Sequence, residues 1–288
     1  MRIYVAAFGF GLVTAAVLAI SAVGFTLQAA IAGVINLSYG SVMIACAFVA
    51  YTLNVHGVHI WIAALAAAVS GSILSVLLNR AVFAPFQRQG ASRVAMMIVT
   101  LAVGLVVGNA VLAVTGPDNV SYAMSYGESV RWGALVLTTS QLWIMGLAVV
   151  LMTSLHVLLR FTKLGKAMRA TAANQTLARN SGIRTRRVID VTWALTGALC
   201  GLAGTVFAID SASFGPSSAG LFLVVILAAA VFGGIGRPYG AMAGAVVLGI
   251  VTEVSAALIA PDYKEIVAFM ILLVLMAVRP QGVFARAQ

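Results

Sequence analysis

Charged residues are scarce in this sequence, and acidic residues are the scarcest of them. Asp and Glu together account for 7 of the 288 residues, and all charged residues for 8%. Hydrophobic residues make up 62% of the chain, and its mean hydropathy is +1.08. A soluble domain of this length needs a polar surface, so the composition excludes one. It indicates a polytopic membrane protein that has the lipid bilayer as its surroundings.

Cysteine and histidine are rare as well. The two cysteines, Cys46 and Cys200, both lie inside apolar segments, where they are typical packing residues, and they form no disulfide framework. The three histidines are too few and too scattered for a metal site. No arrangement of Ser, His and an acid is visible either. The sequence therefore predicts neither a metal nor a cofactor.

A nucleotide-binding motif is also missing. Gly165 and Lys166 are followed by Ala167, and the earlier Gly of the pattern G-x-x-x-x-G-K-[ST] is absent. We therefore predict that the chain is not an enzyme and does not itself hydrolyse ATP. The net charge of +10 would suit a nucleic acid, but the basic residues lie at the ends of loops and not on a soluble face. No nucleic-acid partner is predicted.

Apolar windows of nearly membrane-spanning length follow one another along the chain. A spanning helix needs roughly 20 residues, and the windows are 4–30, 38–53, 60–79, 94–114, 141–159, 188–208, 219–232, 240–259 and 265–278. We take the first as a retained helix, because no small-residue cleavage site followed by a soluble domain comes after it. The predicted fold class is all-α, a polytopic transmembrane helix bundle of about eight or nine spans in a single domain over residues 1–288.

Small residues punctuate these windows. Gly197 and Gly201, for example, are four residues apart, which places both on one face of a helix. Small residues at this spacing let two helix backbones approach closely, and close packing drives helix association in lipid. We therefore expect these glycines at helix contacts.

The main polar segment of the chain is residues 160–187. It contains no acidic residue, and its basic residues are Arg160, Lys163, Lys166, Arg169, Arg179, Arg184, Arg186 and Arg187. Basic loops are retained in the cytosol, so we expect this segment and the C-terminus on the cytosolic side. Nine spans would then place the N-terminus outside, and eight would place it inside. Asp190 lies one helical turn beyond Arg186 and Arg187, and is expected to be their ion-pair partner.

Segment 160–187 also carries signals for local structure. Residues 166–173 are good helix formers, Asn174 can cap a second short helix, and Gly182 can end it in the left-handed conformation. We expect a helix, a turn and a helix lying flat under the membrane. A simple positive-inside anchor would explain the composition equally well. An anchor needs no caps or helical register, however, whereas a docking surface for a soluble partner needs both.

Residues 33–40, GVINLSYG, interrupt an otherwise apolar run. They are either a tight cytosolic turn or a break at membrane depth, which is tolerated only where the backbone is buried in protein or lines a cavity. The second alternative would make them a candidate substrate site. Residues 37–40 also resemble residues 212–215 on the other side of the membrane, as an inverted repeat would require. Four similar residues arise easily by chance.

Glu253 is the ionisable residue deepest within a predicted span. A carboxylate there is costly, so it should face the interior of the bundle or a water-filled cavity. Two explanations remain open. Glu253 either contacts a substrate ammonium group or a gate, or it makes a hydrogen bond between two helices.

Four motifs in order resemble the permease subunit of the branched-chain amino acid ABC importers, the LivH type. Residues 34–51, VINLSYGSVMIACAFVAY, are similar to the INxAHGxxxMxGAY segment of that family, with Tyr39 where His is common. Residues 162–183 resemble its cytoplasmic signature, residues 232–253 its Gly-rich turn and following helix, and residues 263–284 its C-terminal block. The resemblance covers nearly the whole chain.

The resemblance implies an importer permease of the bacterial plasma (inner) membrane that moves a branched-chain amino acid or a similar small polar solute by alternating access. The implied partners are a second permease subunit (a similar chain or a homodimer), two ATPase subunits and an extracytoplasmic solute-binding protein. The implied ATPase-coupling residues are Gly165, Lys166, Arg169, Asn174 and Gly182. The implied residues of the translocation pathway are Asn36, Ser38, Gly40 and Glu253. The alternative is a stand-alone secondary transporter or channel, for which Glu253 is the candidate ion site.

Overall fold

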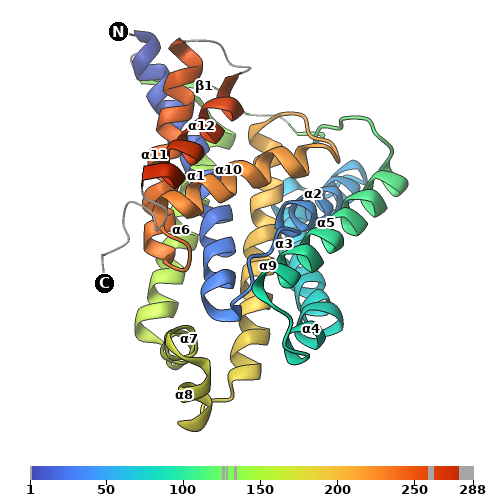
Figure 1. Cartoon of the computed structure of the whole chain (residues 1–288). Coiled ribbons are helices and arrows are strands. Elements are labelled where there is room, and N and C mark those ends of the chain that lie inside the picture. Colours follow the sequence, from blue (N-terminus) through green and yellow to red (C-terminus); the bar gives the residue numbers. More distant parts are fainter. Residues whose placement is uncertain (1, 125–126, 128, 133–134, 259–262, 279–288) are drawn as a thin grey trace.

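The chain folds into a bundle of α-helices with one short hairpin of strands (Figure 1). The computed structural model describes residues 2–124, 127, 129–132, 135–258 and 263–278. Within these residues, six helical segments are long and apolar enough to cross a membrane. They belong to α1 (Arg2–Ala32), α3 (Ile60–Leu78) with its continuation, α5 (Arg93–Thr115), α6 (Thr139–Phe161), α9 (Thr185–Asp210) and α11 (Pro238–Leu258).

Three further apolar helices are shorter: α2 (Tyr39–Val55), α10 (Ser218–Gly233) and α12 (Lys264–Val278). Each of the nine predicted windows coincides with one of these nine helices, so the all-α polytopic bundle is confirmed. The exact number of complete spans is not, because α2 and α10 are shorter than a bilayer requires. The predicted end of the window 240–259 lies outside the described residues, as does the part of the predicted C-terminal block beyond residue 278.

Two elements were not predicted from the sequence. The loop between α5 and α6 contains an antiparallel hairpin of β1 (Ser129–Trp132) and β2 (Leu135–Thr138), with Ser129 opposite Thr138. At the end of α3 the helix does not stop at residue 79. It continues through a π-helical turn, η1 (Asn79–Phe83), into α4 (Ala84–Arg88). Both elements are too short for a hydrophobic period to reveal them.

α1 and α9 form the centre of the bundle and are buried on most sides, whereas α5 and α6 expose most of their surface. In Figure 1, α1 descends from the N-terminus and α9 rises beside it from α8 (Gln175–Asn180) at the lower end. α7 (Lys163–Ala173) and α8 lie at the lower ends of α6 and α9, and α7 also contacts α1 (Figure 1). The two central helices are therefore antiparallel and define the long axis of the molecule.

The two central helices make matching contacts. α1 packs along α11, and α9 packs in the same way along α3. α2 then packs on α3 as α10 packs on α11, and α2 also touches α10 where Gly40 meets Ala219. Two similar units, one of α1, α2 and α3 and the other of α9, α10 and α11, would give this arrangement if a two-fold axis near Gly40 related them. This is the geometry of an inverted repeat. When α2 and α10 are matched by their first residues, Tyr39 corresponds to Ser218. The similar residues 37–40 and 212–215 then do not correspond to each other.

The pair α3 and α9 approaches closely through glycine. A side chain at Gly197 would collide with the backbone of Gly71 and with Ser75, and one at Gly201 would collide with the backbone of Ala67. Small residues at four-residue spacing thus let the two helix backbones touch, as the sequence predicts. The contact is the counterpart of that between α1 and α11, where Gly249 lies against Ala15.

We predict that Gly197→Ala lowers the unfolding temperature of the protein in detergent. The added methyl group has no space, and overpacking of this kind costs about 1–3 kcal/mol. Gly146→Ala is the matched control, because Gly146 lies in α6 with open space around it. That control should be neutral or stabilising by about 0.5–1 kcal/mol, the usual gain from replacing Gly inside a helix. Equal unfolding temperatures for the two variants would contradict the packing described here.

Candidate functional site

α7 is joined to the end of α6 by a rigid turn. The hydroxyl of Thr162 accepts a hydrogen bond from the backbone N–H of Gly165 (2.9 Å) and donates one to the carbonyl of Leu158 (2.6 Å). Gly165 itself is buried, and a Cβ there would collide with the carbonyl oxygens of Leu158 and Leu159. Only glycine fits at this joint, so the start of α7 lies directly against the end of α6.

α7 has one face against the bundle and one face toward solvent. Gly165, Met168 and Thr171 are buried, and Met168 is completely inaccessible. Lys166 and Arg169 are exposed. The helix register therefore anchors α7 by its apolar side and presents its basic side outward.

α8 has the caps that the sequence predicts. The side chain of Asn174 accepts a hydrogen bond from the backbone N–H of Leu177 (2.9 Å), and Gly182 has a φ of 82° in the left-handed region. The expected helix, turn and helix are thus present. Sequence reasoning did not single out Leu177, which is 64% exposed on α8 among polar residues. An exposed Leu on a basic, capped helix is a candidate contact for a partner, and its position facing away from the core could have been found only from the fold.

A small cavity of about 110 Å³ separates α7 from the centre of the bundle. It is lined by Leu27 and Ile31 of α1, by Met168 and Arg169 of α7, and by the turn between α10 and α11. From that turn, the hydroxyl of Tyr239 lies 3.0 Å from Nδ1 of His156 on α6. His156 is thus a polar contact between helices, as expected. α7 is therefore adjacent to the end of α1 and to the start of α11, both of which belong to the core.

Most of the interruption at residues 33–40 is buried inside the protein, although Gly33 at its start is exposed. Asn36 and Ser38 are almost inaccessible, and Asn36 accepts hydrogen bonds from the backbone N–H of Ser38 (3.1 Å) and from its hydroxyl (2.5 Å). The hydroxyl of Thr100, inside α5, accepts a hydrogen bond from the N–H of Leu37 (3.3 Å). Its own hydrogen lies between the carbonyls of Met97 (2.9 Å) and Ile35 (3.2 Å). Of the two alternatives, this agrees with a break that lies beside spanning helices and is hydrogen-bonded within the protein.

Glu253 lies far from that break. Its carboxylate accepts hydrogen bonds from the hydroxyl of Thr14 on α1 (2.8 Å) and from the ammonium group of Lys264 on α12 (2.6 Å). Thr14 lies in the half of α1 nearer its start, whereas Asn36 follows the end of α1. The predicted pathway residues therefore form two groups: Asn36, Ser38 and Gly40 at the break, and Glu253 toward the opposite end of the bundle.

Asp190 has a different partner from the one predicted. It pairs with Arg80 of η1 at 2.9 Å, and it also accepts a hydrogen bond from Asn79 (3.2 Å). The prediction of a pair with Arg186 or Arg187 was wrong, because the π-helical turn brings Arg80 against α9. This long-range contact has no signal in the local sequence.

Tyr39, at the start of α2, is buried in an unusual way. Its hydroxyl has no hydrogen-bond partner among the described residues, and it lies against Gly24 of α1, where no side chain would fit. Its ring packs edge-on against Phe25 at a centroid distance of 5.8 Å. A buried hydroxyl without a partner is destabilising.

The family model for the permease component of branched-chain amino acid transport systems matches residues 7–276. The chain belongs to this family. The permease is 27% identical to the high-affinity branched-chain amino acid permease LivH of Escherichia coli K12, over 94% of this chain and 92% of that protein. It is 26% identical to BraD of Pseudomonas aeruginosa, over 96% and 94% of the two chains. It is therefore a multi-pass membrane component of a transport system.

A solved structure has a similar fold. PsaBC from Streptococcus pneumoniae, in complex with a Fab, matches with a TM-score of 0.52 over 94% of the permease and 91% of the matched chain. The sequence identity is 16%, so this likeness concerns the fold alone. It supports the helix arrangement described above.

We predict that Tyr39→Phe does not lower the unfolding temperature of the permease. The hydroxyl makes no hydrogen bond, and leaving such a group buried costs about 1–3 kcal/mol, so its removal should be neutral or stabilising. Thr100→Val is the control, because it removes a hydroxyl that is hydrogen-bonded to the backbone of Ile35 and Leu37. That variant should be destabilised. A clear loss of stability in Tyr39→Phe would show that the hydroxyl is hydrogen-bonded after all.

Proposed function

We propose that this chain is the permease subunit of an ABC importer for branched-chain amino acids or a similar small polar solute. The observation that carries the proposal is its membership of the permease family over residues 7–276. The partners would be a second permease subunit, two ATPase subunits and an extracytoplasmic solute-binding protein. The importer would lie in the bacterial plasma membrane.

The orientation follows from the distribution of charge. The end of the bundle with α7 and α8 holds most of the basic residues: Arg80, Arg88, Arg93, Arg160, Lys163, Lys166, Arg169, Arg179, Arg184, Arg186, Arg187 and Arg237. Among the described residues, Asp190 is the one acid at that end. The positive-inside rule then favours this end, here called the basic end, as the cytosolic one. With nine helices the C-terminus would be cytosolic and the N-terminus outside.

The ATPases would bind the outward face of α7 and α8. Lys166, Arg169, Asn174 and Gly182 are exposed there, together with the apolar Leu177. Gly165 would act differently, as the joint through which a movement of α7 reaches α6. From α7 the movement would also reach α1 and the turn before α11. ATP and solute must favour different conformations for hydrolysis to drive import.

The translocation pathway would use the break between α1 and α2. Asn36, Ser38 and Gly40 lie at this break, where non-helical backbone is available near the middle of the bundle. Discontinuous helices supply backbone polar groups for small polar solutes in many transporters. Glu253 would contribute at the end where the binding protein delivers solute.

A stand-alone ion-coupled transporter is less well supported. It would need a carboxylate within the membrane that is available to an ion. Glu253 is the candidate, but Lys264 and Thr14 already occupy the same carboxylate oxygen. A paired carboxylate fits a structural link between α1, α11 and α12 better than an ion site.

We predict that Arg169→Glu uncouples ATP hydrolysis from solute uptake. Charge reversal on the exposed face of α7 would repel the partner while leaving the buried face of α7 intact. Uptake of labelled leucine should fall about tenfold or more in vesicles containing the complete importer, a loss of at least 1.4 kcal/mol in coupling. Arg160→Glu, at the end of α6, is the control for charge alone. Unchanged coupled uptake in Arg169→Glu would contradict the role of α7.

We also predict that Leu177→Ala weakens binding of the ATPase subunits. Burying a Leu side chain in an interface contributes about 1.5–3 kcal/mol, so the amount of ATPase that co-purifies under dilute conditions should fall about tenfold. Leu105→Ala is the matched control, because Leu105 is 60% exposed but lies on α5. Equal co-purification with both variants would exclude Leu177 from the interface.

A further inference from the structure

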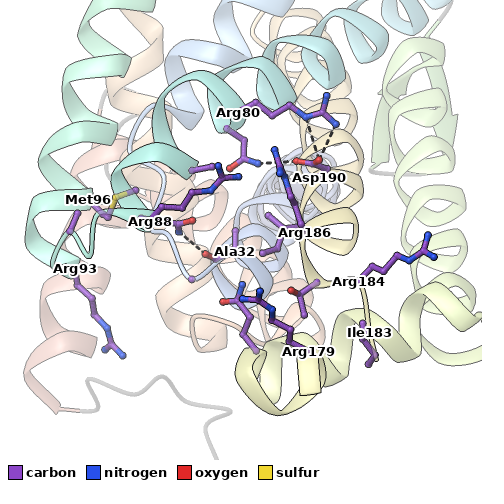
Figure 2. Close-up of a pocket in the computed structure, with 18 residues that line it drawn as sticks. Ala32, Arg80, Arg88, Arg93, Met96, Arg179, Ile183, Arg184, Arg186 and Asp190 are labelled. Atoms are coloured by element: carbon purple, nitrogen blue, oxygen red, sulfur yellow. Dashed lines mark hydrogen bonds and ion pairs between the residues drawn. The ribbon is translucent and has the colours of Figure 1, made fainter. Parts of the chain in front are cut away.

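A cavity of about 790 Å³ lies at the basic end next to α8 (Figure 2). Its floor is the end of α1, at Ala32 and Gly33. One wall comes from η1, α4 and the start of α5, and the facing wall from α8 and the start of α9. Lys166 and Arg169 do not line it, so the cavity is distinct from the outward face of α7.

Arginine dominates the charge of this cavity. The lining arginines are Arg80, Arg88, Arg93, Arg179, Arg184 and Arg186, and Asp190 is the only acidic residue with them. Figure 2 shows Arg88 and Arg186 near the centre, on opposite walls, and Arg93 and Arg184 reaching outward at the two edges. Several guanidinium groups thus surround one volume.

Asp190 does not neutralise this group. Both oxygens of its carboxylate are already bonded, by the guanidinium of Arg80 (2.9 and 3.3 Å) and by the amide of Asn79 (3.2 Å). In the part of the chain that the structure describes, the other lining arginines make no ion pair. All of them are exposed, so water and salt screen their mutual repulsion, and an anion bound among them would reduce it further.

The chemistry of guanidinium defines the anion. Arginine presents a planar fork of donors that matches the oxygens of a phosphate group, and it is less strongly hydrated than lysine. A single phosphate occupies only part of about 790 Å³, so the cavity has room for a phosphate with its glycerol or for two phosphates. Both descriptions fit the headgroups of anionic phospholipids.

The surface next to the cavity fits the remainder of a lipid. α5 begins at Arg93, on the rim, and continues with the exposed apolar side chains of Val94, Ile98 and Leu101. A headgroup in the cavity would therefore have its acyl chains along α5. An acidic protein segment would match the charge of the cavity but not this apolar strip.

We propose that this cavity binds the phosphate group of an anionic phospholipid, such as phosphatidylglycerol or cardiolipin, with Arg88 and Arg186 as its central ligands. Basic pockets between membrane helices on the cytosolic side bind such headgroups. The bound lipid links the wall formed by α4 and α5 to the wall formed by α8 and α9. It thereby stabilises the connection between the ATPase-facing helices and the end of α1.

The test measures lipid binding to the purified, delipidated permease. Phosphatidylglycerol or cardiolipin is titrated in detergent, lipid adducts are counted by native mass spectrometry, and the unfolding temperature is followed in parallel. Both lipids should bind and raise the unfolding temperature, whereas phosphatidylcholine should not. Arg88→Gln and Arg186→Gln should each weaken phosphatidylglycerol binding about fivefold, the effect of about 1 kcal/mol per arginine near the membrane surface.

Two control variants separate the site from general charge. Arg160→Gln removes the same charge at the basic end but outside the cavity, and should leave lipid binding unchanged. Arg88→Lys keeps the charge without the guanidinium fork, and should restore part of the affinity. An equal loss in Arg160→Gln and Arg88→Gln would overturn the proposal. So would equal stabilisation of the wild-type chain by phosphatidylcholine, a result that does not depend on the folding of any variant.

Two further measurements identify the source of the phosphate. If inorganic phosphate at millimolar concentration stabilises the permease as much as phosphatidylglycerol and displaces it, the ligand is a free anion and the lipid proposal fails. If added ATPase subunits displace the lipid, and their binding is lost in Arg88→Gln, the cavity is part of the ATPase interface and the proposal also fails. Retention of lipid in the assembled complex supports it.

Discussion

The constraint on which this structure depends is that backbone N–H and C=O groups inside a membrane must be hydrogen-bonded within the protein. The break between α1 and α2 meets it through Thr100 of α5, which bonds the backbone on both sides of Asn36. Such a break can exist only where other helices enclose it. This is why α1 and α9 are central, and why glycines let α3 and α11 approach them so closely.

Enclosure of the central helices has consequences for movement. α7 is bonded rigidly to α6 at Gly165, yet it faces α1 and the turn before α11 across a small cavity. α7 thus contacts the bundle both at its joint with α6 and along its buried face. The hydroxyl of Tyr39 and the indole N–H of Trp193 are buried without partners among the described residues. A buried polar group without a hydrogen-bond partner lowers the stability of the conformation that contains it. A second conformation in which the group is hydrogen-bonded would be favoured by the same amount.

Most of the positive charge of the protein lies at one end of the bundle, the basic end. The basic end combines an outward face on α7 and α8 with an inward cavity lined by arginine, and these surfaces meet different surroundings. The outward face is convex and capped, which suits a soluble ATPase. The cavity lies beside the lipid-facing strip of α5, which suits a headgroup. Under the proposed orientation, this end would contact both the ATPase subunits and the lipid headgroups.

The sequence by itself determined the nine apolar helices, the basic segment with its caps at Asn174 and Gly182, and the family, because each depends on neighbouring residues or on motifs read in order. Only the tertiary structure decided the pair of Asp190 with Arg80, the burial of the break, and the separation of Glu253 from Asn36. These depend on contacts between residues far apart in the chain. In a chain of nearly uniform apolar helices, the hydrophobic pattern says that a helix lies in the membrane but not which helix it faces, since lipid and protein neighbours are equally apolar.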